Sequence, residues 1–360
     1  MEAPIKKQTL RSVREVLSDE VFKNPNFRGI YYFVQSMFVY ILSLVILQQV
    51  ESIYLLLPAW LFAGVAISGL FVIGHDCAHG ALFRSERLNY WVGFLSMIPS
   101  LHAYNQWAYG HNRVHHGHTI KREADFVWHP VSVDTYNSYA WSKKLQHKLY
   151  WSFLGAGPYY LYEIWLKGMV LYSAPKKEAK RDQIILAMIF LLLGAGLFYF
   201  GSTSQGSFTI SGGAWYFFKM FVVPFIVWNY FIGFTVYIHH IHKDIPWKVS
   251  KDWTPYYGQM QGTINYHVNP IYNFFIHNIY IHSPHHVHMK IPFYNLNKAL
   301  EEIKSVYGDE VKESKSIVKE YFASTLQCKL IDAKNGQWLT YKQAKLSYPT
   351  SNLQFATGGK

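Results

Sequence analysis

Residues 54–79 read YLLLPAWLFAGVAISGLFVIGHDCAH, and this stretch decides what kind of fold the chain adopts. Residues 54–73 contain no charged side chain and are long enough for a helix to cross the hydrocarbon core of a bilayer. His75 and His79 follow directly. Their spacing places both on one face of a helix, within reach of one metal ion. The stretch therefore predicts a transmembrane helix that ends in a metal-binding segment at the membrane surface.

Two further short stretches repeat this concentration of histidine, at residues 111–116 (HNRVHH) and 282–286 (HSPHH). Together they add His111, His115, His116, His282, His285 and His286. Ser283 and Pro284 are typical of an N-cap and a first helical residue, which predicts a short helix carrying the last two histidines. Eight imidazoles exceed what one ion in an open site needs and suit a dinuclear centre. Iron is the favoured metal because all-nitrogen ligation tolerates both of its common oxidation states, whereas zinc needs fewer ligands.

The composition is that of a membrane protein. Half of the 360 residues are hydrophobic, 18% are aromatic and only 16% are charged, against roughly 25% charged residues in soluble proteins. The net charge is +12, with Lys and Arg placed between apolar runs rather than in one stripe. This favours attraction to anionic lipid headgroups and acidic redox partners over nucleic acid. The two cysteines, Cys77 and Cys328, indicate no disulfide framework.

Apolar runs predict an all-α integral membrane protein with four transmembrane helices, at about residues 30–50, 54–73, 184–200 and 214–238. Residues 90–101 are too short to span and predict a re-entrant or interfacial segment, and residues 150–172 predict an interfacial helix. The Gly- and Ser-rich residues 201–213 predict a loop. Beyond the last span we expect a charged helix at 300–326 and a small β-hairpin at 328–341, turning at Asn335-Gly336.

Positive charge orients these spans. The connections at residues 48–52 and 201–213 contain no Lys or Arg, so the positive-inside rule places both termini and the long middle region in the cytoplasm. All three histidine stretches then fall on the cytoplasmic side, which predicts one shared site. The resulting division is a basic arm (1–29), a membrane domain (30–345) whose histidine-rich cytoplasmic cap comprises 74–183 and 239–345, and a tail (346–360).

Metal-bound histidines usually pass their second ring proton to an acceptor such as a carboxylate. Asp76, Glu123 and Asp125 are the nearby acidic candidates for this role. His102 and His147 are expected to be ordinary surface or core residues, whereas His267 and His277 stay open candidates for a role at the site.

The three histidine stretches resemble the histidine boxes of the membrane fatty acid desaturase superfamily. The resemblance covers roughly residues 71–341 and extends to 238–247 (IHHIHKDIPW), 262–263 (GT), 277–279 (HNI) and 291–296 (IPFYNL). These segments are similar to omega-6 (delta-12 type) acyl-lipid desaturases.

That resemblance implies a centre of two iron ions that uses dioxygen and two electrons to remove two hydrogens from a fatty acyl chain of a membrane lipid. It also implies a further ligand between the second and third boxes. We expect this to be His240, with His239 and His242 as alternatives. An external electron donor, a ferredoxin or b-type cytochrome, and a bacterial-type plasma membrane are expected as well.

Two other functions remain open. The same site in a carotenoid ketolase, lipid hydroxylase or alkane monooxygenase would yield a different product. A histidine-rich metal transporter or sensor would place ionisable ligands at the membrane midplane. The nearly charge-free spans favour an enzyme over a transporter.

Overall fold

The computed structural model describes residues 8–204, 206–334 and 336–348 of the chain. Its four longest helical stretches are α2 (Asn26–Gln49), α3 (Ile53–Ala78), α10 (Lys177–Thr203) and a continuous run of α11 (Ile210–Phe217), η4 (Phe218–Val222) and α12 (Val223–His240). Each is long and apolar enough to cross a membrane. The prediction of an all-α integral membrane protein with four spans is confirmed.

The spans are longer than the apolar runs that revealed them. α3 continues past the predicted end at residue 73, and α10 begins at Lys177 rather than 184. At the start of α10 the helix persists into the interface, where the long side chains of Lys177 and Lys180 extend into water. The last turn of α3 is instead buried within the protein. α2 likewise begins at Asn26, inside the predicted arm 1–29.

Residues 201–203 and 210–213 of the predicted loop are helical, which corrects the prediction at both of its ends. α10 runs to Thr203 and α11 begins at Ile210, because small residues let these two helices pack backbone against backbone. A Cβ added to Gly212 would lie 2.7 Å from the carbonyl oxygen of Gly201. The Thr203 hydroxyl donates to the Tyr199 carbonyl at 3.0 Å, so its polarity is satisfied within the helix.

The fourth span changes from α-helical to π-helical hydrogen bonding in the turn that precedes Pro224. Proline has no N–H to offer the preceding turn, and the helix widens into the π-helical segment η4 just before it. The Trp60 indole donates to the Lys219 carbonyl at 2.9 Å, which satisfies one backbone group of this segment. The span therefore stays continuous through the membrane.

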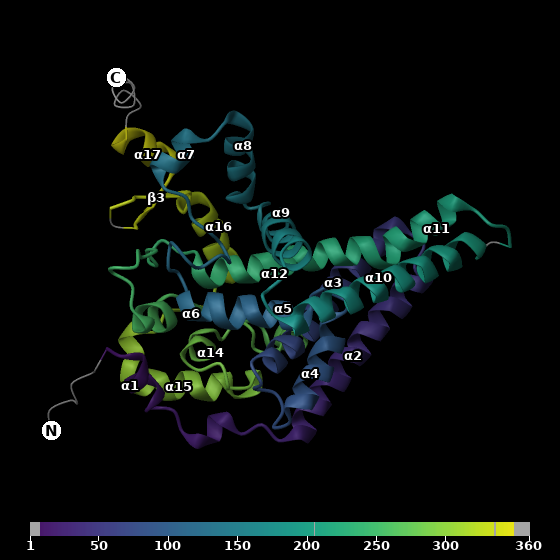
Figure 1. Cartoon of the computed structure of the whole chain (residues 1–360), viewed down its shortest axis with the longest axis horizontal. Coiled ribbons are helices and arrows are strands. Elements are labelled where there is room, and N and C mark those ends of the chain that lie inside the picture. Colours follow the sequence, from purple (N-terminus) through teal and green to yellow (C-terminus); the bar gives the residue numbers. More distant parts are fainter. Residues whose placement is uncertain (1–7, 205, 335, 349–360) are drawn as a thin grey trace.

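The four spans differ in how much of each the protein itself covers. The apolar windows of α3 and of the Ile210–His240 span are 67% and 50% buried, against 22% for α2 and 11% for α10. α3 packs against both α2 and α12, and Figure 1 shows it at the centre of the spans. The two central spans are thus the rigid supports of the fold, and α10 faces lipid.

The remaining elements gather mostly at one end of the spans (Figure 1). In chain order they are α1 (Leu10–Arg14), η1 (Asp19–Phe22), α4 (Glu86–Met97), α5 (Tyr104–Ala108), η2 (Tyr109–His115), α6 (His116–His118), α7 (Val133–Ser138), α8 (Trp141–Tyr150), α9 (Ala156–Tyr159), η3 (Tyr160–Leu171), η5 (Tyr257–Gln261), α13 (Pro270–Ile276), α14 (Ser283–Val287), η6 (Phe293–Asn295), α15 (Leu296–Tyr307), η7 (Gly308–Glu310), α16 (Ile317–Gln327) and α17 (Tyr341–Ser347). α4 corresponds to the short segment predicted at 90–101, and α9 with η3 to the helix predicted at 150–172.

Among the residues that the structure describes, four two-residue strands form two small sheets. β3 (Leu330–Ile331) pairs antiparallel with β4 (Trp338–Leu339), where the hairpin is predicted. Asn335 of its turn lies outside the described residues, as do residues 1–7 of the arm and 349–360 of the tail. β1 (Asn265–Tyr266) pairs in parallel with β2 (Glu313–Ser314). Strands of two residues leave no recognisable pattern, so the sequence does not predict this pairing.

Candidate metal centre

The last turn of α3 carries the first histidine box. His75 lies within the helix and His79 caps its end. Both side chains are buried, and their ring centroids lie 4.6 Å apart, as expected for residues one helical turn apart. Gly80 follows with φ of +62°, which turns the chain away from the span. The first box therefore lies at the end of a membrane helix, as the sequence predicts.

The second box lies on a π-helix rather than an α-helix. η2 places His111 and His115 on its i→i+5 ladder, and His116 begins α6. Trp107, one turn earlier, stacks on His111 with ring centroids 4.2 Å apart and planes at 21°. π-helical turns are rare and occur frequently at functional sites. Here His111 and His116 face the first box, and His115 faces His240 and His286 instead.

The third box begins α14, but Ser283 is not its N-cap. The cap residue is His282, and Ser283 is the first residue of the helix. The reason is Asn265, whose side-chain oxygen accepts from the N–H groups of His282 and Ser283 at 2.8 and 2.9 Å. A distant asparagine thus performs the capping that the sequence assigned to the local serine.

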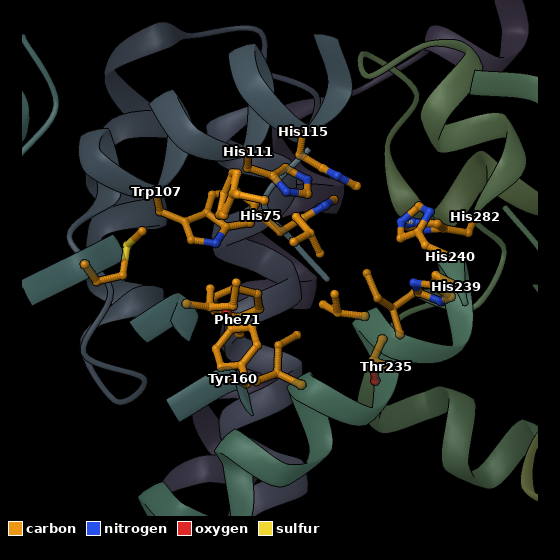
Figure 2. A pocket seen from close by; sticks show the side chains of 17 residues that line it. Phe71, His75, Trp107, His111, His115, Tyr160, Thr235, His239, His240 and His282 are labelled. Atoms are coloured by element: carbon orange, nitrogen blue, oxygen red, sulfur yellow. Dashed lines mark hydrogen bonds between the residues drawn. The ribbon is translucent and has the colours of Figure 1, made fainter. Parts of the chain in front are cut away.

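Seven of the nine predicted histidines form two compact groups. Within each group, one nitrogen of every ring lies within 4.8 Å of the others. The four-histidine group consists of His75, His79, His111 and His285, and the three-histidine group of His115, His240 and His286. Figure 2 shows His75, His111 and His115 on one side of a cavity and His239, His240 and His282 on the other.

His116 and His282 join the two groups into one buried cluster. The Nε2 atom of His116 lies 3.2 Å from that of His111, and its ring stacks on His286 at 4.3 Å. The Nε2 atoms of His282 and His240 lie 3.3 Å apart. All nine predicted histidines are therefore brought together, from three boxes and the end of α12.

Contacts with carboxylates and a backbone carbonyl fix the Nδ1 atoms of several rings. His75 Nδ1 lies 3.0 Å from Asp76, and His115 Nδ1 lies 3.0 Å from Asp125. His240 Nδ1 donates to the Gly262 carbonyl at 3.0 Å. Such contacts select one tautomer and leave Nε2 with a free lone pair. Burial alone would raise the pKa of Asp125, but contacts with His115 and the backbone hold this pKa below its ordinary value.

Several buried ring nitrogens of the cluster have no hydrogen-bond partner. His79, His116, His282 and His285 each have at least one buried ring nitrogen with no hydrogen bond. Burial, reinforced by neighbouring imidazoles, lowers the pKa of His111 and His285 well below the ordinary value. The rings are therefore neutral at pH 7, the form that binds metals. Leaving so many buried polar atoms unpaired is costly unless a cation occupies their centre.

The remaining candidates lie elsewhere. His239 stacks on His282 at 3.7 Å but belongs to neither group. His242 faces Glu320, at 3.3 Å. His277 bonds the Ser36 hydroxyl at 2.7 Å and His267 bonds Glu313 at 2.5 Å.

Two expectations about individual residues have different outcomes. Glu123 accepts from the N–H and the hydroxyl of Ser250, both at 3.3 Å, so it is not an acceptor for a site histidine. His102 and His147 are buried residues that bond tyrosine hydroxyls, as core histidines do.

Sequence reasoning missed three supporting groups. Gln259 accepts from His286 Nδ1 at 2.8 Å and contacts the His116 carbonyl. Gln259 lies in the short π-helix η5 and Gly262 caps its end, and no spacing in the sequence marks them. Trp107, by contrast, could have been found from its position four residues before His111.

An apolar cavity adjoins the histidines (Figure 2). Its empty space, including the part that is open to the surroundings, is about 650 Å³. Its lining combines histidines of both groups with apolar residues, among them Phe71, Trp107, Tyr160, Ile164, Met169 and Ile232. A dry cavity beside a metal site is suited to holding a hydrocarbon chain for oxidation. The histidines that α3 and α12 contribute to this site lie at the ends of these helices and not at the middle of a span. Ion transporters, by contrast, place ionisable ligands within the membrane.

Comparison with known proteins agrees with this geometry. The model of the family described as fatty acid desaturase matches residues 52–314. An sn-1 oleoyl-lipid 12-desaturase of Arthrospira platensis is 30% identical, over 71% of this chain and 70% of its own length. An sn-1 acyl-lipid omega-3 desaturase (ferredoxin) of Synechocystis is 29% identical, over 90% and 88%. The chloroplastic omega-6 fatty acid desaturase of Spinacia oleracea is 29% identical, over 81% and 62%. The chain belongs to the fatty acid desaturase family and is a membrane-bound desaturase enzyme.

Proposed function

We propose that this enzyme introduces a double bond into an acyl chain of a membrane lipid, of the delta-12 (omega-6) type, at a centre of two iron ions. The observation that carries the proposal is that nine histidines, eight of them buried and His111 half-buried, adjoin one apolar cavity. The relatives named as oleoyl-lipid 12-desaturases and omega-6 desaturases support the substrate class. A relative named as an omega-3 desaturase has a similar identity, so the relatives agree on the substrate class and differ in the position of the double bond.

The two histidine groups match two ligand sets. We assign His75, His79, His111 and His285, joined by His116, to one ion. His115, His240 and His286, joined by His282, are assigned to the other. All-imidazole coordination by neutral rings suits iron in both of its oxidation states. His240 rather than His239 or His242 is the ligand from the end of α12, since its Nδ1 is held by Gly262 and its Nε2 points at the group.

Bound iron supplies the activation of dioxygen that the reaction needs. In balance, one dioxygen, two electrons and two protons are consumed, two hydrogens leave a –CH₂–CH₂– unit, and two waters form. The chain's own residues hold the imidazoles in position, exclude water and align the acyl chain. The electrons come from an external donor, a ferredoxin or b-type cytochrome, and the name of the Synechocystis relative supports the former.

The orientation and the division of the chain follow the distribution of charge. The connections between the spans at 48–52 and 201–213 carry no Lys or Arg, so both termini and the metal centre face the cytoplasm. We retain the basic arm (1–29), the membrane domain (30–345) and the tail (346–360), in a bacterial-type plasma membrane.

Expression in a host that lacks polyunsaturated lipids tests the function. Mass spectrometry of the total fatty acids should reveal dienoic chains with a new double bond at carbon 12, absent from cells with an empty vector. Hydroxylated or ketonic lipid without any new double bond would assign the same centre to a hydroxylase or ketolase. A trienoic product from supplied linoleate alone would assign it to omega-3 desaturation instead.

A further inference from the structure

A second apolar cavity opens on the side of the protein that faces lipid. It lies between η3 and α10, and its empty space, including the part that is open to the surroundings, is about 710 Å³. Gln183 is the one polar side chain among the described residues that line it. We call this cavity the lateral groove and define it by Leu101, Trp165, Val170, Leu186, Ala187 and Phe190.

The outer wall of the lateral groove is the span that the protein covers least. Only 11% of the apolar window of α10 is buried. Ala187 is exposed, while Leu186, one residue earlier, is buried in the groove. An apolar hollow on a lipid-facing helix is open to the acyl chains of the bilayer. Its natural occupant is therefore hydrocarbon rather than water.

Met169 is shared by the lateral groove and the cavity beside the histidines. Its side chain is buried, and it lies five residues after Ile164, one repeat of the π-helix η3, so both face the metal side. The Met169 carbonyl accepts from Gln183 of α10 at 2.8 Å, which fixes the backbone. Methionine is unbranched and adapts its shape readily. The residue that the linings of the two cavities share is thus a flexible side chain on a held backbone.

The lysines at the start of α10 indicate how far below the membrane surface the lateral groove lies. Lys176, Lys177 and Lys180 are exposed at the start of α10, where their ammonium groups meet lipid headgroups. Leu186 lies about 14 Å further along the helix at 1.5 Å per residue. A lipid whose headgroup contacts these lysines would therefore place the middle of an acyl chain at the groove.

We propose that the lateral groove binds an acyl chain of an intact bilayer lipid and admits it sideways into the metal cavity past Met169. The inference rests on the proposed desaturation of membrane lipid and adds the route by which the chain arrives. A substrate on a soluble carrier would instead enter from the water phase and would not need the groove.

Blocking the groove from the lipid side tests this route. Ala187→Phe fills it without touching the histidines, and Ala195→Phe makes the same change at an exposed position eight residues further along α10, outside the groove. Ala187→Phe should lower the formation of double bonds at least about tenfold by denying access. Ala195→Phe should leave it as in the unchanged protein. Iron content and elution in detergent should be equal in all three proteins.

A binding measurement makes the test independent of activity. The protein is placed in vesicles of phosphatidylglycerol whose acyl chains are brominated. The fluorescence of Trp165 is obtained by subtracting the fluorescence of the Trp165→Phe variant from that of the protein that retains Trp165. Brominated chains should quench this fluorescence in the unchanged protein and in Ala195→Phe, but not in Ala187→Phe. Unquenched Trp165 in the unchanged protein, or full activity of Ala187→Phe, would overturn the lateral route. If quenching occurs but no double bond forms in any variant, the groove binds lipid and the proposed reaction is what fails.

Discussion

The two histidine groups differ in how the protein holds their rings. Every member of the three-histidine group has its Nδ1 fixed, by Asp125, by the Gly262 carbonyl or by Gln259. In the four-histidine group, His75 is fixed by Asp76, whereas both nitrogens of His79 and the Nε2 of His285 have no partner. The first arrangement is set by the fold before any metal arrives. The second depends more on the metal itself to complete it, which makes the two groups separable by mutation.

Removing one ligand from each group should have the largest effect. His285→Ala and His115→Ala should each abolish detectable product, because either change leaves a coordination site open. His115→Ala also removes the partner of the buried Asp125, so its unfolding temperature should fall further than that of His285→Ala. Fatty acid profiling, iron per chain and thermal unfolding of purified protein measure these outcomes. Product from His285→Ala would remove that residue from the ligand set, and equal unfolding temperatures would contradict the difference between the groups.

The acidic residues should show the next largest effect. Asp125→Asn should reduce activity roughly 10- to 100-fold, the usual cost of losing a partner to a metal-bound histidine. Asp76→Asn should cost less, because Asp125 accepts from His115 and two backbone N–H groups, whereas Asp76 accepts from His75 and only one.

Glu123→Gln is the matched control for these two variants. It changes an exposed carboxylate two residues from Asp125 that contacts Ser250. In membranes containing equal amounts of enzyme, the initial rate of Glu123→Gln should equal that of the unchanged protein. A loss in Glu123→Gln as large as that in Asp125→Asn would mean that general charge, and not the contact with His115, is responsible.

Glu123 and Asp125 also illustrate how far the sequence can be read. The spans and the eight box histidines are predictable because apolar length and short-range spacing are local properties. Glu123 and Asp125 are equally good candidates by position, but the backbone turns between them and buries only Asp125. Gln259 and the Gly262 carbonyl reach the site through the tertiary fold alone. The apolar runs alone do not predict the ends of the spans. α10 begins earlier because lysines at the membrane interface are compatible with helix, and α3 ends later because its last turn is buried by the rest of the protein.

The smallest predicted effect concerns a buried histidine outside both groups. Burial, with repulsion from Lys329 and Lys143, lowers the pKa of His147 to about 3, against about 6.5 in an unfolded chain. The folded state therefore keeps His147 neutral while the unfolded state gains a proton below pH 6.5. The resulting stabilisation is complete above pH 6.5 and is lost as the pH falls toward 3. At pH 5 the loss is about 2 kcal/mol.

His147→Gln isolates this contribution, because glutamine does not titrate and can still bond the Tyr341 hydroxyl that contacts His147 at 2.9 Å. In metal-free protein, the unfolding temperature should fall less between pH 7.5 and pH 5 in His147→Gln than in the unchanged chain, by a few degrees. The histidines of both metal groups are present in the two proteins, so their own response to acid cancels in the difference. An equal fall in both would mean that folded His147 takes up a proton as readily as the unfolded chain does. All of the acid sensitivity of the metal-free protein would then have to come from other groups.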